Sequence, residues 1–349
     1  MSQLQETTER HRFDVERLAQ YLAGQLPGFA GPLTVKQFQG GQSNPTYLLA
    51  TPGRSYVMRS KPGPVAKLLP SAHAIEREFR VMRALGSQGI PVPEVLLLCE
   101  DESVIGRAFF LMQHVDGRVL WDPSLPGTAP ENRAAIYDEM NRVLAALHRV
   151  DVAAAGLADY GRAGNYFERQ IGRWSKQYRA SATEPIEAMD RLIDWLPAHV
   201  PAGDETAVVH GDFRLDNLIF HPTEARVLAV IDWELSTLGH PLADFSYLCM
   251  GWHIPPGAFR GIAGLDLAAL GIPAEEAFIR RYCERTGRSG IAHWNFYLAY
   301  NLFRIAAILQ GVYKRALEGM ASADNALAAG ENAKALAAIG WDYAAKADR

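Results

Sequence analysis

Three oxygen-bearing side chains near the middle of the chain have the spacing that ATP-dependent phosphoryl transfer requires. Asp212 follows an apolar stretch, Asn217 comes five residues later, and Asp232 ends another apolar stretch. An aspartate can orient an acceptor hydroxyl and take its proton, while an asparagine and a second aspartate can hold Mg2+ against the phosphates of ATP. Because Mg2+ keeps several water or phosphate ligands, two protein ligands are enough. The alternative is that Asp212 and Asn217 only cap a turn.

Short strands are expected to position these groups. The segment 208–221 (VVHGDFRLDNLIFH) predicts a strand, then a loop that carries Asp212 and Asn217, then another short strand. The segment 227–234 (VLAVIDWE) predicts a strand that ends on Asp232. The second aspartate is therefore expected at the end of a strand that neighbours the loop.

The first third of the chain predicts a sheet with one helix. The glycine-rich segment 40–44 separates the first two strands, and Thr51-Pro52-Gly53 is a strong turn signal before the third. Apolar residues at helical spacing follow Pro70-Ser71, and Gly86 or Gly89 can end that helix. The predicted strands cover residues 33–39, 46–50, 54–60, 94–99 and 108–115, with the helix after the third.

A mainly helical remainder is expected after a boundary near residues 116–128, where glycine and proline cluster. The stretch from residue 274 onward is almost entirely helical in its pattern. Its apolar run from Trp294 to Leu309 contains polar residues and is too short to span a bilayer comfortably. We therefore expect a buried helix there and no membrane association.

Composition argues against several classes of protein. The net charge of −4 and the pI of about 6.2 argue against a nucleic-acid binder. Cys99, Cys249 and Cys283 are isolated, which indicates reduced, buried thiols and neither a zinc site nor a disulfide framework. The polar N-terminal residues lack the apolar core of a signal peptide. A cytoplasmic protein is the expectation.

The motifs resemble those of the aminoglycoside phosphotransferase and choline kinase family, and within it the kinase-like domain fused to certain acyl-CoA dehydrogenases. The match runs in order over roughly residues 30–315, through GGQSNPTYLL, YVMRSKP, IEREFRVMRAL, PVPEVL, FFLMQHVDGR and HGDFRLDNLIF…IDWELSTLGHPLADFSYL. The resemblance implies an α+β, protein-kinase-like fold with two lobes. It implies an N-terminal helical extension (1–29), an antiparallel five-stranded N-lobe with one helix that binds nucleotide (30–116), and a helical C-lobe with the catalytic loop and substrate site (117–349).

The same resemblance assigns roles in the central motif. Asp212 is implied as the catalytic base, with Asn217 and Asp232 as the ligands of Mg2+, and ATP as the phosphoryl donor. His210 is expected to support the loop by hydrogen bonding, and Asp244 to brace the loop.

Five uncharged residues of the first lobe are expected to bind the nucleotide. Gly41, Ser43 and Asn44 belong to the glycine-rich segment, whose N–H groups and serine hydroxyl can bind phosphate oxygens. A plain hairpin turn would have the same sequence pattern. Gln113 and Val115 lie in a segment that resembles the linker whose backbone binds adenine.

The sequence departs from the family pattern at the basic residue of the third strand. Glu78 resembles the helix glutamate that pairs with a lysine there, but Arg59 occupies the aligned position. Lys61 lies two residues further, on the same face of a strand. Arginine can hold a phosphate bidentately, so either residue could contact the α- and β-phosphates.

These observations favour a small-molecule kinase that phosphorylates an alcohol group. A nucleotide-binding pseudokinase module is an alternative. A protein kinase is disfavoured because the loop contains HGD, not HRD, and no DFG or APE motif follows.

The acceptor is expected to be anionic and partly hydrophobic. Residues 161–180 contain one acid, Glu168, and five basic residues, Arg162, Arg169, Arg173, Lys176 and Arg179, although a solvated helix face would look the same. Asn301 and Arg304 lie one turn apart in an apolar helix and are predicted to face the substrate. The resemblance points to a hydroxyacyl-CoA or hydroxy acid and to an association with an acyl-CoA dehydrogenase. An aminoglycoside or choline is the alternative acceptor.

Overall fold

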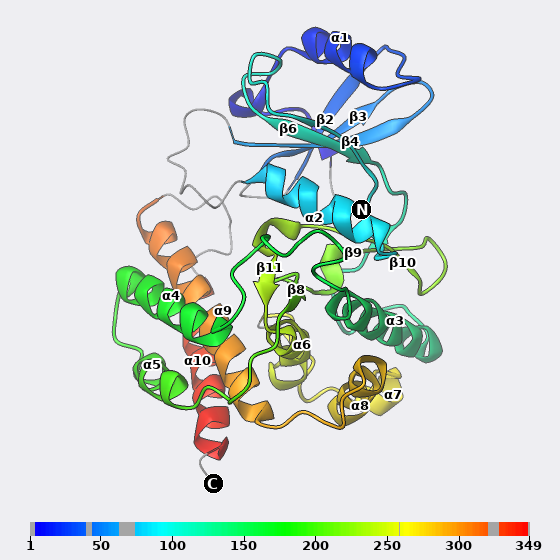
Figure 1. Cartoon of the computed structure of the whole chain (residues 1–349). Coiled ribbons are helices and arrows are strands. Elements are labelled where there is room, and N and C mark those ends of the chain that lie inside the picture. The colour runs from blue at the N-terminus through cyan, green and yellow to red at the C-terminus, as the bar shows by residue number, and fades with distance from the viewer. Residues whose placement is uncertain (1–3, 40–43, 63–73, 258, 320–327, 348–349) are drawn as a thin grey trace. The chain divides into compact units, whose positions relative to one another are not determined.

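The computed structural model describes residues 4–39, 44–62, 74–257, 259–319 and 328–347, and the chain divides into two compact units (Figure 1). Unit 1 contains Met1–Leu120, Val150–Tyr160 and Leu215–Ser236. Unit 2 contains Trp121–Arg149, Gly161–Arg214 and Thr237–Arg349. The first boundary between the units follows Leu120, and two later segments, Val150–Tyr160 and Leu215–Ser236, pack with unit 1, whereas the expected second lobe is continuous from residue 117.

An antiparallel sheet forms the body of unit 1. The predicted five strands are present, and a two-residue strand at the N-terminus adds a sixth, in the order β1-β2-β3-β4-β6-β5. The strands are β1 (Leu4–Gln5), β2 (Thr34–Phe38), β3 (Thr46–Ala50), β4 (Ser55–Ser60), β5 (Val95–Cys99) and β6 (Phe109–Gln113). Strand β4 pairs with β3 on one side and β6 on the other, so it lies inside the sheet.

Two helices and a short 3-10 helix, η1 (Glu9–His11), accompany this sheet. Helix α1 (Val15–Gln25) begins where Asp14 accepts a hydrogen bond from Arg17 N, and its Leu18 and Leu22 pack into the core of the sheet. Helix α2 (Ile75–Ser87) is amphipathic, and its buried face includes Glu78, a charged residue among apolar neighbours. A buried carboxylate needs a partner, which identifies Glu78 as a position to examine.

The predicted magnesium ligands lie just outside the strands of a second, three-stranded sheet in unit 1. It has the order β10-β9-β7, from β7 (Arg118–Val119), β9 (Leu218–Phe220) and β10 (Val227–Val230). Short 3-10 helices, η2 (Leu215–Asn217) and η3 (Trp233–Leu235), flank the β9–β10 hairpin. A side chain at Gly117 would meet Phe220 O at 2.4 Å, so only glycine allows the chain to run this close to β9.

Unit 2 is mainly helical (Figure 1). A two-stranded ribbon, β8 (Ala207–Val209) with β11 (Thr237–Gly239), leads into the loop that carries Asp212. The helices are α3 (Pro130–His148), α4 (Tyr166–Ser181), α5 (Glu187–Ala198), α6 (Pro241–Cys249), α7 (Leu267–Leu270), α8 (Glu275–Thr286), α9 (Trp294–Leu317) and α10 (Ala328–Ala347), with the 3-10 helix η4 (Met250–His253).

Helix α9 is the centre of unit 2. It contacts α4, α5, α6 and α10, and most of its residues from Phe296 to Ala307 are buried. The predicted buried helix is therefore confirmed, with more turns than the apolar run suggested. Within the described ranges, no helix combines the length and apolar character needed to cross a membrane.

The close approach of Tyr166 to β11 generates a prediction for Gly239. A methyl group there would lie 2.6 Å from the Tyr166 ring and 2.9 Å from a Val209 methyl. We expect Gly239→Ala to lower the free energy of unfolding by about 1–3 kcal/mol through overpacking. Gly172→Ala is the control, because nothing lies within 4 Å of that position in α4 and alanine favours helix by about 0.5–1 kcal/mol. Urea unfolding that shows equal effects of both changes would contradict this packing.

Candidate active site

The loop after β8 is fixed by a buried carboxylate of α6. Asp244 accepts hydrogen bonds from the backbone N–H groups of His210 and of Gly211, the latter at 2.8 Å. The Nδ1 atom of His210 in turn accepts from Asp212 N at 3.2 Å. Asp244 therefore braces the loop and His210 supports it, as the sequence indicated.

Asp244 remains ionised in this setting. Burial alone would raise its pKa, but the nearby imidazole of His148, the charge of His210 and the hydrogen bond from Gly211 N hold the pKa below its ordinary value. His148 Nε2 lies 3.6 Å from the carboxylate. A charged acceptor strengthens its bonds to N–H donors, which favours one loop conformation.

The carboxylate of Asp212 contacts two side chains that the sequence analysis did not identify. Tyr247 donates its hydroxyl proton to Oδ1 at 2.5 Å, and Arg214 Nε lies 3.0 Å from Oδ2. A signal was available for Tyr247, since it lies three residues after Asp244 and thus on the same face of α6. Both residues belong to unit 2, as Asp212 does.

The two predicted substrate residues of α9 both take part in internal contacts. Asn301 has 0% exposure and donates to Ala243 O at 2.9 Å and Ser246 Oγ at 2.7 Å, so it lies inside the unit and has no open face for a substrate. Arg304 donates to Gly211 O at 2.5 Å. The expected cleft position of Asn301 is therefore corrected to a packing position.

The predicted magnesium ligands meet at one end of the β9–β10 hairpin in unit 1. Val230 pairs with Leu218, and Ile231 N donates to Asn217 O at 2.9 Å. Asn217 immediately precedes β9 and Asp232 follows Ile231, so the hairpin brings the two residues together. Asp232 has φ 67° and ψ 59°, the left-handed region that is costly for a residue with a side chain. Such strain is typical of positions under functional constraint.

Arg59 lies at the centre of three carboxylates of unit 1. Its Nε is 3.0 Å from Glu78, and its other end is 2.8 Å from Asp232 and 3.0 Å from Glu234. The predicted pair of Arg59 with Glu78 is confirmed. Lys61 instead pairs with Glu76 at 3.2 Å, on the more exposed part of α2.

The charges in this cluster are unequal. Burial raises the pKa of Glu78 to about 7, although Arg59 acts to lower it. Burial would lower the pKa of Arg59, and the carboxylates of Glu78, Asp232 and Glu234 reverse this, so the guanidinium stays charged. One cation faces three acids, and a divalent cation would relieve the excess of negative charge.

The nucleotide-binding predictions are only partly covered by the described residues. Asn44 is fully buried and donates to Glu78 at 3.0 Å, while Gly41 and Ser43 lie outside the described residues. Gln113 ends β6, where it pairs with Tyr56, and its side chain is exposed. Val115 follows two residues later in a segment without regular secondary structure.

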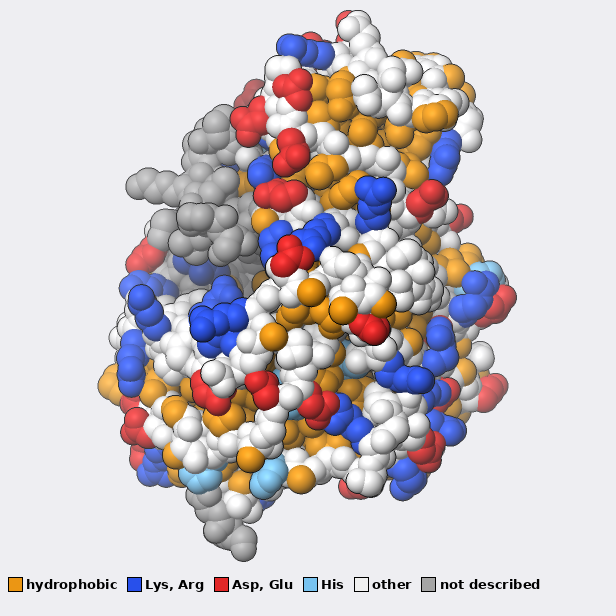
Figure 2. Space-filling model, viewed as in Figure 1, with side chains coloured by type: hydrophobic (Ala, Val, Ile, Leu, Met, Phe, Trp, Pro, Cys, Tyr) orange, Lys and Arg blue, Asp and Glu red, His pale blue; other side chains and the backbone are white. Residues whose placement is uncertain are grey.

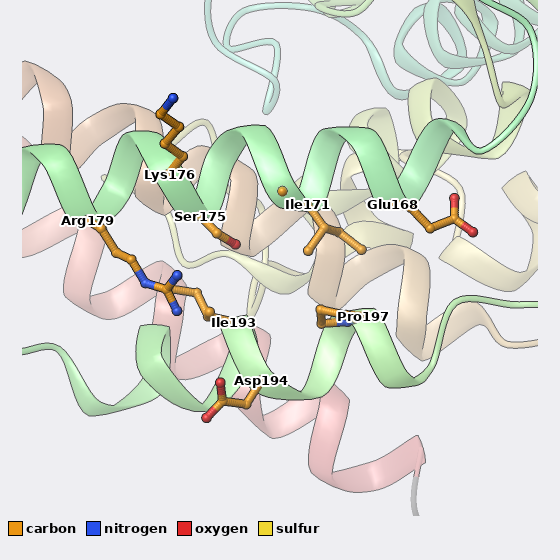
Figure 3. Close-up of a pocket in the computed structure, with 9 residues that line it drawn as sticks. Glu168, Ile171, Ser175, Lys176, Arg179, Ile193, Asp194 and Pro197 are labelled. Carbon is orange, nitrogen blue, oxygen red and sulfur yellow. The ribbon is translucent and has the colours of Figure 1, made fainter.

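A groove of about 500 Å³ lies between α4 and α5 of unit 2 (Figure 3). Ile171 and Arg179 point from α4 toward α5, whereas the Lys176 ammonium points away (Figure 3). Lys176 and Arg179, two of the basic residues that suggested an anionic acceptor, line this groove, whereas Asp212, Asn217 and Asp232 do not. The lining residues are Glu168, Ile171, Gly172, Ser175, Lys176, Arg179, Ile193, Asp194 and Pro197.

Comparison with known proteins agrees with this fold. A crystal structure from Ralstonia eutropha JMP134, which carries a provisional aminoglycoside phosphotransferase name, is 61% identical, with a TM-score of 0.89 over 96% of this chain and 99% of the other. Aminoglycoside phosphotransferase APH(4)-Ia, solved with AMP-PNP and hygromycin B, shares the fold at 18% identity, with a TM-score of 0.60 over 93% of this chain and 98% of the other.

The curated relatives include proteins named as acyl-CoA dehydrogenases. Mouse acyl-CoA dehydrogenase family member 10 is 52% identical over 95% of this chain, which spans 31% of that relative. The chain thus covers well under half of that protein's length. The sequence profile described as "Phosphotransferase enzyme family" matches residues 34–294. The chain therefore belongs to the phosphotransferase enzyme family, whose kinase-like fold it shares.

Proposed function

We propose that the chain transfers the γ-phosphoryl group of Mg2+–ATP to a hydroxyl of a small molecule. The observation that carries the proposal is the convergence of Asn217 and Asp232 at one end of a hairpin, where Asp232 pairs with Arg59, which also pairs with Glu78. The braced Asp212 precedes Asn217 by five residues. Each role that phosphoryl transfer needs has a residue of suitable chemistry.

The donor groups suit Mg2+. The carboxylate of Asp232 and the side-chain oxygen of Asn217 are hard oxygen ligands, and magnesium needs few of them from the protein. The Asp232 side chain is 33% exposed, which leaves room for water and phosphate oxygens. When bound, the ion would neutralise charge that develops on the phosphates.

The remaining roles fall to side chains of the chain itself. Asp212 would hold the acceptor hydroxyl and receive its proton. Arg59, always charged, would contact the α- and β-phosphates while Glu78 keeps its orientation. In that state the nucleotide phosphates would replace Asp232 or Glu234 as partners of the guanidinium.

An anionic acceptor fits the surface of unit 2 better than a polycation. Arg169, Arg173 and Lys176 follow the spacing of one face of α4, and none forms an ion pair with a carboxylate of the described residues. Figure 2 shows Lys and Arg side chains gathered over this helix. An aminoglycoside would require carboxylates for charge complementarity.

The names of the relatives suggest which kind of anion the acceptor is. A mouse relative carries the name of an acyl-CoA dehydrogenase. An acyl-CoA bears several negative phosphates and an apolar chain. We therefore propose a hydroxyacyl-CoA or a hydroxy acid as the acceptor, and an association with an acyl-CoA dehydrogenase as the setting.

The proposed roles of the two aspartates separate binding from turnover. Because Asp232→Ala removes a proposed metal ligand, it should abolish the Mg2+-dependent rise in melting temperature that ATP causes. The fold itself should remain intact. Asp212→Asn should keep that shift and lose turnover by a factor on the order of 10² or more. Asp342→Asn, on the exposed face of α10, is the control. Undiminished turnover in Asp212→Asn would refute the base, and an unchanged shift in Asp232→Ala would refute the ligand.

The phosphate contact should belong to Arg59 and not to Lys61. Arg59→Ala should raise the Michaelis constant for ATP at least about tenfold, since a charged hydrogen bond contributes about 1.5–3 kcal/mol. Lys61→Ala should change it much less, because Lys61 pairs with Glu76. Arg54→Ala, in the exposed turn of the same hairpin, controls for lost charge. A larger effect of Lys61→Ala would reverse the assignment.

The acceptor class can be tested by ADP release with a 4-hydroxyacyl-CoA, kanamycin and choline in parallel. We expect turnover of the acyl-CoA only, and a raised Michaelis constant for it in Arg173→Ala/Lys176→Ala. Lys346→Ala, an exposed change on α10, should leave that constant unchanged. Fast turnover of kanamycin or choline without the acyl-CoA would overturn this choice and leave the kinase activity established.

A further inference from the structure

The carboxylate of Asp212 is held at both oxygens by side chains of unit 2. Tyr247 donates to Oδ1 at 2.5 Å, and Arg214 Nε lies 3.0 Å from Oδ2. A carboxylate can accept about four hydrogen bonds, so these two contacts alone do not use its whole capacity. What the two contacts remove is rotation of the carboxylate about its last bond.

Tyr247 is suited to be a permanent donor. Its ring is buried, with 5% exposure, and it projects from α6, the helix that also carries the bracing Asp244. Burial and the negative charge of Asp212 both raise the pKa of the Tyr247 phenol. The hydroxyl therefore keeps its proton throughout the working pH range, and the bond to Asp212 is charge-assisted.

Arg304 of α9 contacts both the loop that carries Asp212 and the ring of Tyr247. It donates to Gly211 O at 2.5 Å, in the residue before Asp212, and its guanidinium lies 5.4 Å from the centre of the Tyr247 ring. The Trp174 ring is at 5.8 Å. No carboxylate of the described residues forms an ion pair with Arg304, although the residue has only 7% exposure. A buried charge held by a carbonyl and two rings fixes the loop and the tyrosine together.

We propose that Tyr247 is a positioning residue for the catalytic carboxylate: its hydroxyl sets the orientation in which Asp212 meets the acceptor hydroxyl, and Arg304 fixes the ring that carries it. The inference rests on the proposed role of Asp212. Tyr247 acts through Asp212 and needs no contact with ATP, Mg2+ or the acceptor. Its loss should therefore reduce turnover and leave substrate affinity unchanged.

A merely structural tyrosine would behave differently. If Tyr247 only filled space, phenylalanine would replace it without cost, because the ring and its contact with Arg304 remain. If it stabilised the whole unit, its loss would lower the melting temperature and affect all kinetic constants together. Only a positioning role predicts a fall in kcat without a change in the Michaelis constants, and only when Asp212 is present.

The experiment compares Tyr247→Phe, Asp212→Asn and the double variant in the full chain. Tyr247→Phe should lower kcat roughly 10- to 100-fold, the range expected for a hydrogen bond to a charged group, with the Michaelis constants unchanged. In the Asp212→Asn background the same change should have no further effect on the residual rate. Tyr137→Phe is the matched control, because this buried tyrosine of unit 2 donates to Pro123 O, away from the loop.

A second measurement needs neither an acceptor nor turnover. The Tyr247 hydroxyl proton, bound to a carboxylate at 2.5 Å, should give a downfield proton NMR signal. The signal should be absent in Tyr247→Phe, shifted or lost in Asp212→Asn, and present in Tyr137→Phe. Because Asp212→Asn retains the tyrosine, it reports on the bond even where Tyr247→Phe folds poorly.

The outcomes distinguish this inference from the proposed function. Full kcat in Tyr247→Phe, an additive loss in the double variant, or a hydroxyl signal that ignores Asp212→Asn would each overturn the positioning role. Full turnover in Asp212→Asn, or no turnover with any acceptor, would instead overturn the proposed function. The NMR signal would then still decide whether Tyr247 holds Asp212.

Discussion

The hydrogen bonds from two consecutive backbone N–H groups to the buried carboxylate of Asp244 are the constraint on which the loop that carries Asp212 depends. A buried carboxylate without partners would be costly, and so would two buried N–H groups, so each satisfies the other. His148 supplies further stabilisation from α3. Once the amides of His210 and Gly211 are fixed, the direction of the following side chain, Asp212, is largely determined.

A comparable constraint organises unit 1 around Arg59. Its position inside the sheet, on β4, fixes one end of the side chain, and the carboxylate of Glu78 on α2 fixes the other. The contacts with Asp232 and Glu234 then link the sheet to the β9–β10 hairpin. A lysine, with a single ammonium, could not join three carboxylates in this fork geometry. The departure from the usual lysine thus has a structural consequence, because one arginine joins three carboxylates.

The sequence predicted features that depend on local pattern or on the family resemblance, and it failed where a contact between distant segments has neither. The strands around Asp212 and Asp232 follow from periodicity, whereas the pair of Arg59 with Glu78 and the bracing Asp244 follow from the resemblance. Tyr247 and Arg304 contact residues 35 and 93 positions away. No local pattern encodes such contacts. The polar Asn301 within an apolar helix was predicted to face a substrate, but its side chain forms a hydrogen bond to Ser246 of α6 instead. Two-residue strands such as β1 are likewise too short for a period to show.

The covalent chain itself limits how far Asp212 and Asn217, the proposed base and metal ligand, can separate. Asp212 belongs to unit 2, whereas Asn217 and Asp232 belong to unit 1, and the boundary falls between Arg214 and Leu215. Five residues of fully extended chain span at most about 18 Å. The 3-10 turn at Leu215–Asn217 shortens that reach further. The chain therefore keeps Asp212 within one short loop of Asn217, and Asp244 and Ile231 anchor the two ends of that loop separately.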